Sequence, residues 1–124
     1  MKRLPSLLAV IAVLCAPMLV RADTDPVNGV WNISGQVEGF PVTVRCEFER
    51  HGDQLGGVCH DDGTGQAHVL QTGSVHGDQV TWTYRRRFLV AIFEPQYSGQ
   101  IDGTSMTGAI SVAGHSGAFK ADRE

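Results

Sequence analysis

The fold of this chain is constrained most by two cysteines, Cys46 and Cys59, that flank a turn signal symmetrically. Gly52-Asp53 suits a two-residue hairpin turn, because glycine accepts the positive φ that such turns require. Counting outward from that turn places Cys46 opposite Cys59 in a non-hydrogen-bonded pair, whose Cα atoms are about 4.5 Å apart. A disulfide tolerates Cα separations down to roughly 4.4 Å. The sequence therefore predicts an antiparallel hairpin that is tied across its middle by a disulfide.

The amino terminus has the pattern of a secretory signal peptide. A basic start, Met1-Lys2-Arg3, precedes an apolar run from Leu7 to Val20, and Val20-Arg21-Ala22 fits a small-residue cleavage site. The alternative is a membrane anchor, but the run is short for a span, which needs about 20 apolar residues. We therefore expect residues 1–22 to be a signal peptide, residues 23–124 to be a single domain, and the protein to be periplasmic or secreted.

Charge and cysteine content narrow the possible partners of the exported chain. Residues 23–124 contain seven Lys or Arg and thirteen Asp or Glu, a formal charge of −6. We expect no nucleic-acid partner, because that affinity comes mainly from a basic surface that neutralises phosphates. Cys15 would leave with the signal peptide, and two remaining cysteines in an exported chain indicate one disulfide. Two free thiols or half a metal site are the alternatives.

The rest of the chain alternates apolar and polar residues in short segments between turn signals, with no segment of helical period. The phrase His51–Gln54 recurs as His76–Gln79 and predicts a second tight hairpin, in which Val75 faces Val80. Asp102-Gly103 predicts another hairpin, and Gly114–Gly117 the last turn, before a strand over Ala118–Ala121. Eight short strands with short connections predict an antiparallel meander.

Glycines recur in the middle of the predicted strands, on their inward faces: Gly35, Gly57, Gly73, Gly99 and Gly108. A glycine weakens a strand, but it also lets a sheet coil sharply and another surface approach closely. Its repetition from strand to strand favours an all-β fold in which the meander closes into an up-and-down β-barrel of about eight strands. A two-sheet β-sandwich is the alternative.

The opening of the first strand, Gly29-Val30-Trp31, resembles the Gly-x-Trp start of the lipocalins and other calycin-type barrels, in which the tryptophan closes the barrel floor. Gly77–Trp82 and Ile101–Gly108 resemble small exported bacterial barrel proteins that have no assigned function. The resemblance implies a barrel over most of residues 23–124. The chain is shorter than a typical lipocalin and lacks the usual terminal helix, so no ligand class follows.

Arg86 is the most distinctive candidate for a binding role, because it falls in register with Trp82 and Tyr84 on the predicted fifth strand and would point inward near a barrel mouth. A buried arginine can hold a ligand carboxylate through two hydrogen bonds. A solvated strand end that pairs with Glu94 or Glu47 is the alternative. Asp61 is the one clear acid on the inward faces, so either Asp61 or a bound anion pairs Arg86. The predicted ligand-binding residues are Arg86, Tyr84, Trp82, Trp31, Tyr97, Phe48 and Met106.

The segment Phe88–Phe93 falls where the meander needs a turn, yet it contains no turn residue. It is interpreted either as a longer strand with a buried bend or as an apolar lip that contacts a lipid, a membrane surface or a partner protein. No catalytic residue, metal or cofactor is predicted: His60-Asp61-Asp62 and His68 carry metal-binding atoms, but their spacing matches no known ligand frame.

Three functions are carried forward. The first is an exported barrel that binds a small apolar or amphipathic molecule, with or without a carboxylate, in its interior. The second is a protein-interaction module, such as an inhibitor of an extracellular protease or lysozyme. The third is an enzyme of the cyclase or isomerase kind, for which the sequence offers no acid–base pair. A ligand-holding cavity would favour the first function, and a solid core with a protruding loop would favour the second.

Overall fold

The computed structural model describes residues 25–124, and the predicted signal peptide lies outside the described residues. Residues 25–124 form ten strands: β1 (Gly29–Val37), β2 (Phe40–His51), β3 (Gln54–Asp61), β4 (Ala67–His76), β5 (Gln79–Tyr84), β6 (Arg86–Phe88), β7 (Ala91–Phe93), β8 (Gln96–Asp102), β9 (Ser105–Val112) and β10 (His115–Arg123). Within residues 25–124 no helix has the length and apolar character needed to cross a membrane.

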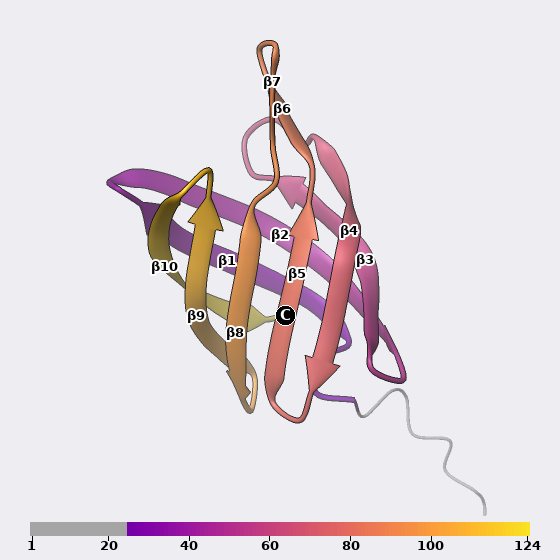
Figure 1. Ribbon diagram of the computed structural model, residues 1–124. Helices are drawn as coiled ribbons and strands as arrows, with labels where there is room; N and C mark the ends of the chain where they lie inside the picture. The colour runs from indigo at the N-terminus through magenta and orange to yellow at the C-terminus, as the bar shows by residue number, and fades with distance from the viewer. Residues whose placement is uncertain (1–24) are drawn as a thin grey trace, which may run out of the picture.

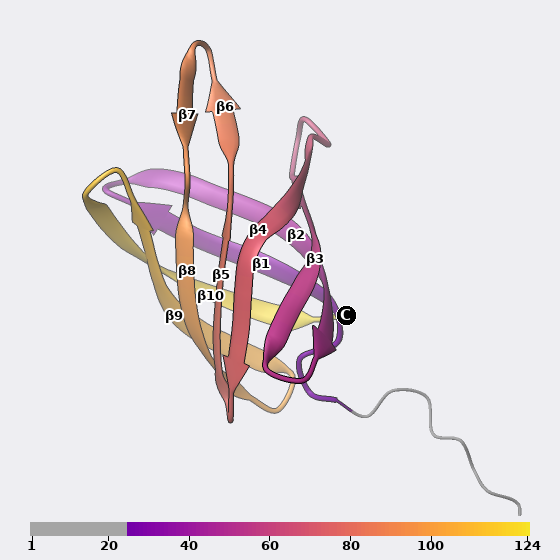
Figure 2. The same cartoon turned by 45° about the vertical axis from the view of Figure 1, so that its right-hand side comes forward.

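Eight of these strands close into an antiparallel barrel in the order β1-β10-β9-β8-β5-β4-β3-β2 (Figure 1). The ring closes where β10 pairs with β1, from Trp31↔Arg123 to Val37↔Gly117. The predicted up-and-down barrel is therefore confirmed, and the β-sandwich alternative is wrong. The remaining strands, β6 and β7, form a separate ribbon that projects beyond the barrel from the ends of β5 and β8 (Figure 2).

The hairpin of β2 and β3 has the predicted register. Its turn is Gly52-Asp53, with φ of 62° at Gly52, and Cys46 pairs with Cys59. The two cysteines form a disulfide with their Cα atoms 4.0 Å apart, and both are fully buried. The repeated phrase makes the same turn between β4 and β5, where Val75 pairs with Val80. The predictions for both hairpins and for the disulfide are confirmed.

The alternating strand faces build one apolar core inside the barrel. Its largest fully buried side chains include Trp31, Trp82, Tyr84, Tyr97, Ile33, Met106 and Ile110. Trp82 stacks on Tyr97 with ring centroids 4.9 Å apart, and the rings of Phe48 and Phe119 meet Trp82 edge-on. Such pairs add about 0.5–1.5 kcal/mol beyond the burial of their area. Aromatic rings from four different strands therefore fill the middle of the barrel.

Two mid-strand glycines show why the barrel closes so tightly. Gly99 of β8 and Gly108 of β9 pair with each other, and the ring of Phe119 lies over both. A Cβ atom at Gly99 would lie 2.9 Å from this ring, and one at Gly108 would lie 2.8 Å from it. Real Cβ contacts are longer, and the nearest obstacles are closer still: Sδ of Met106, 2.7 Å from a Cβ at Gly99, and the backbone oxygen of Ser98 beside a Cβ at Gly108. A side chain at either position would therefore force the core or the neighbouring strand to move.

The last hairpin differs from the prediction. It turns at Ala113-Gly114, where both residues have positive φ (50° and 80°), and β10 begins at His115 instead of Ala118. The predicted turn over Gly114–Gly117 is therefore wrong. Gly117 lies within β10, where an added Cβ would collide with the backbone of Gln36. This glycine is required by the close approach of β1, not by a turn.

The predicted fifth strand is also shorter than expected. Val80, Trp82 and Tyr84 face the core as predicted, but β5 ends at Tyr84, and Arg86 starts a new strand after a break at Arg85. The inward position predicted for Arg86 does not hold, because β6 pairs only with β7 beyond the barrel. All three residues of β6 are exposed.

Candidate functional site

The β6–β7 ribbon ends in exposed apolar side chains. Phe88 pairs with Ala91 across the two-residue turn Leu89-Val90. The exposed fractions are 61% for Phe88, 81% for Leu89, 98% for Val90 and 62% for Ile92. We call these four residues the apolar tip. The buried bend considered for Phe88–Phe93 is therefore wrong, and the segment has the exposure expected of an apolar lip.

The turn at the apolar tip is made by residues that do not favour it. Leu89 has a φ of 57°, a region that hairpin turns usually fill with Gly, Asn or Asp. β5 and β8 pair up to Thr83↔Gln96, so they lead into the ribbon side by side, and the chain must reverse within it. Tertiary pairing thus imposes the turn. Leucine occupies it at a local cost on the order of 1 kcal/mol.

Three consecutive arginines lie at the base of the ribbon, and we call Arg85, Arg86 and Arg87 the arginine collar. All three are exposed. Arg86 pairs with Phe93 and Arg87 pairs with Ile92 across the ribbon. Successive residues of a strand point to opposite faces, so Arg86 and Arg87 flank the ribbon on its two sides.

A buried polar cluster lies at the mouth of the barrel, where β5 and β8 lead into the ribbon. The hydroxyl oxygens of Tyr84 and Tyr97 are 2.8 Å apart. The His68 ring stacks on the Tyr84 ring with centroids 5.0 Å apart, and His68 Nε2 lies 3.0 Å from Asp61 Oδ2. Arg86 Nε lies 3.3 Å from the same carboxylate oxygen. Arg86 of the arginine collar is therefore tied to the barrel through a buried carboxylate.

The tyrosines of this cluster are poor candidates for acid–base chemistry at neutral pH. Burial raises the pKa of Tyr97, and the neighbouring Tyr84 raises it further. Burial also raises the pKa of Tyr84, although its hydrogen bond with Tyr97 opposes that shift. Both hydroxyls stay protonated and bonded to each other. His68 and Arg86 both contact the carboxylate of Asp61. The polar groups of the cluster therefore have partners, and together they close the mouth of the barrel.

The predicted ligand-binding residues fall into two groups. Inside the barrel are Trp31, Phe48, Trp82, Tyr84, Tyr97 and Met106, each at most 4% exposed. Arg86 lies apart from them, with its side chain 45% exposed and paired with Asp61. The structure thus gives Arg86 the internal carboxylate that the sequence offered as one of two partners. Binding of a small molecule by these residues stays a prediction.

Two buried side-chain nitrogens have no hydrogen-bond partner among residues 25–124: Nδ1 of His60 and the indole Nε1 of Trp82, a donor on a side chain of the core. Leaving such a group unpaired costs about 1–3 kcal/mol. An acceptor atom of a small molecule that entered the barrel would satisfy the indole Nε1.

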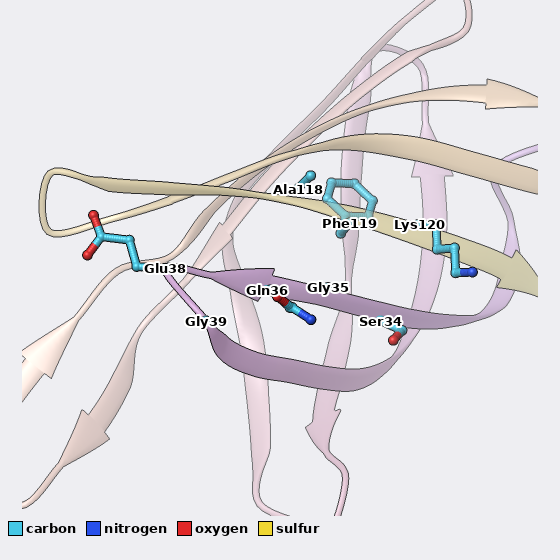
Figure 3. A pocket seen from close by; sticks show the side chains of 8 residues that line it. All are labelled: Ser34, Gly35, Gln36, Glu38, Gly39, Ala118, Phe119 and Lys120. Carbon is cyan, nitrogen blue, oxygen red and sulfur yellow. The ribbon is translucent and has the colours of Figure 1, made fainter.

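Two shallow grooves on the surface lie away from the apolar tip. One runs over β1 and β10 and is lined by Ser34, Gly35, Gln36, Glu38, Gly39, Ala118, Phe119 and Lys120 (Figure 3). The other is lined by Asn28, Gly29, Glu47, Phe48, Glu49, Gly57 and Val58. Phe48 is the one predicted ligand-binding residue that borders either of these grooves. In the first groove, Glu38 and Lys120 lie toward opposite ends, and no cluster of charge gathers in it.

The sequence pattern names His68 only as a metal-binding side chain and Asp61 as a metal-binding side chain or a partner of Arg86, and it does not predict the pairing of His68 with Asp61. Cys59 pairs with His68 across β3 and β4, which places His68 beside the inward end of β3. The register of these two strands shifts between Gln54 and Val58, so alternation alone does not predict this pair. Across residues 25–124 no group of three or more His, Cys, Asp or Glu side chains is arranged to hold a metal ion.

No protein-family model and no curated protein matches this sequence. Among solved structures, the barrel is similar to a redesigned β-barrel, mFAP1, which was solved bound to DFHBI. The TM-score is 0.56 at 15% sequence identity, over 78% of this chain and 94% of that one. At this identity the similarity supports the small antiparallel barrel fold and nothing finer.

Proposed function

We propose that this protein is an exported interaction module that docks onto an apolar partner surface through the β6–β7 ribbon. The observation that carries the proposal is the exposed apolar tip on a ribbon that projects beyond a barrel whose interior is filled by its own side chains. A solid core with a protruding loop is the arrangement that favours an interaction module over an interior binder. Export rests on the basic and apolar pattern of residues 1–22.

The energetics support docking by the apolar tip. Burying one large apolar side chain gains about 1.5–3 kcal/mol relative to leaving it exposed. The four residues of the tip would together supply on the order of 6–12 kcal/mol, against association costs of about 4–15 kcal/mol. The balance predicts weak, reversible binding, strengthened by any contacts that the arginine collar adds.

Replacing Leu89 by Asn and Val90 by Ser should release the protein from its partner without weakening the fold. Asn tolerates the positive φ at position 89 better than Leu does, so the free energy of unfolding should be unchanged or higher. The measurement is gel filtration and sedimentation of gently lysed host cells. Wild-type protein should run in a larger assembly or with membranes, and the variant should run at its monomer mass.

The matched control replaces two exposed apolar residues on the barrel itself, Phe40→Ser with Val69→Ser, which are 76% and 71% exposed in the wild type. This variant should remain in the large assembly. Wild-type protein that runs as a free monomer in its own host, or a control that is released as readily as the tip variant, would remove the proposal.

A second candidate function is binding of a small apolar or amphipathic molecule in the barrel interior. It is supported by the unpaired Nε1 of Trp82 and by the likeness to a barrel solved with DFHBI. Native mass spectrometry of protein purified from its host should then show a bound molecule that Trp82→Phe loses, because phenylalanine has no donor. A bare chain mass for the wild type would exclude this function.

A further inference from the structure

The apolar tip carries apolar side chains on both faces of the ribbon and at its end, with Arg87 beside Ile92 on one face, and this restricts what can cover it. Phe88 and Ala91 share one face of the ribbon, Ile92 lies on the other, and Leu89-Val90 make the end. A flat protein surface would cover one face of the ribbon and leave the other face exposed to water. An occupant has to surround the tip, and a fluid lipid layer does so without a preformed groove.

The charges around the tip favour a negative surface. Residues 25–124 contain seven Lys or Arg and twelve Asp or Glu, a formal charge of −5, yet three of the seven cations form the arginine collar. Glu94 lies near the base of the ribbon, and Asp61 pairs with Arg86. An anionic surface would attract the collar, repel the rest of the barrel and so hold the ribbon end-on.

The length of the ribbon fits shallow insertion. β6 and β7 have three residues each, so they span roughly 10 Å at about 3.3 Å per residue. Within the described part of the chain their outer edges have no strand partner, and unpaired backbone groups cannot enter the hydrocarbon core. Apolar side chains at an interface enter about 5–10 Å, which would bring the arginine collar to the level of lipid phosphates.

We propose that the apolar tip inserts into the headgroup region of an anionic lipid bilayer while the arginine collar binds lipid phosphates. This inference rests on the proposed docking function and names the partner. Arginine suits the role, because its planar guanidinium binds phosphate through two hydrogen bonds and its aliphatic stem lies against apolar groups. The ribbon would contact the membrane, and the barrel would remain in the aqueous phase.

The test is flotation of the purified, oxidised protein with vesicles of phosphatidylcholine that contain about one third phosphatidylglycerol, compared with pure phosphatidylcholine. Wild-type protein should float with the anionic vesicles, bind the neutral ones more weakly, and dissociate as salt is raised. Leu89→Asn with Val90→Ser should weaken binding more than tenfold. The control Phe40→Ser with Val69→Ser should bind as the wild type does.

Arg87→Gln tests the arginine collar separately. It should weaken binding to anionic vesicles by roughly fivefold and reduce the salt dependence, because each arginine near such a surface contributes about that factor. Lys120→Gln, which removes an exposed cation from β10, should have no effect. Arg86 is unsuitable for this test, because its loss would also unpair the buried Asp61.

Equal binding of wild type and tip variant to anionic vesicles, or no binding by the wild type, would overturn the membrane inference. If the wild type ignores vesicles while the tip variant is still released from its host assembly, the partner is a protein and the docking function stands. If the tip variant is also retained in the host assembly, the docking function fails together with the membrane inference.

Discussion

Trp31→Ala should lower the free energy of unfolding by about 3–5 kcal/mol, the range for deleting a large aromatic side chain from a close-packed core. Trp31 is fully buried, and its Nε1 donates a 2.8 Å hydrogen bond to the carbonyl of Val27, which is also fully buried. The variant would lose the ring and leave that carbonyl without its partner. Urea denaturation followed by the fluorescence of Trp82 measures the change.

Trp31→Phe separates the two contributions. Phenylalanine keeps most of the ring and removes the donor, so this variant should lose clearly less than Trp31→Ala. Domains of this size are stable by about 5–15 kcal/mol, so both effects are large enough to resolve. A loss below about 1 kcal/mol for Trp31→Ala would mean that the first strand does not close the barrel as described.

The sequence was most informative where two independent local signals agreed. Gly52-Asp53 defines a turn, and the cysteines lie at equal distances from it, so one register satisfies both. The repetition of the same phrase at His76–Gln79 then located a second hairpin. Alternation of apolar residues predicted most of the remaining interior positions, because side chains on a strand alternate with a period of two. β4 is the exception, because its register shifts between Leu70 and Thr72.

The sequence was least informative where one residue type serves two purposes. The sequence pattern predicts a turn that begins at Gly114 and ends at Gly117. In the structure Gly114 lies in the turn, whereas Gly117 makes room for the backbone of β1. Leu89-Val90 gave no turn signal at all, since the pairing of β5 with β8 forces the reversal. Close approach and tertiary pairing are not visible in a local pattern.

Arg86 shows the same limit for the candidate site. Alternation continued through Arg85 predicts an inward position for Arg86, but β5 ends at Tyr84 and Arg86 is exposed. The choice between Asp61 and a bound anion as its partner could be stated from the sequence but not decided, because it depends on which strand ends meet at the mouth. The structure places Arg86 Nε 3.3 Å from Asp61, and binding of an anion by Arg86 stays a prediction.

Loss of the disulfide should lower the free energy of unfolding by about 2–3 kcal/mol, because the bond closes a short loop and restricts the unfolded chain. Cys46 and Cys59 are 13 residues apart in sequence. The variant Cys46→Ala with Cys59→Ala removes the bond and keeps the site apolar, and urea denaturation of the variant and the wild type measures the difference. Wild-type protein should weigh two hydrogens less before reduction than after it.

The disulfide prediction also separates stability from binding. The bond joins β2 and β3, whereas the apolar tip extends from β5 and β8 on a ribbon of its own. Where the variant is still folded, it should therefore float with anionic vesicles as the wild type does, although it unfolds at lower urea. Cys46 and Cys59 that are both freely alkylated in folded, oxidised protein would contradict the disulfide. A folded variant that no longer binds vesicles would show instead that the position of the ribbon depends on the β2–β3 hairpin. The connecting contacts would be the pairing of Cys59 with His68 and the contact of His68 with Asp61.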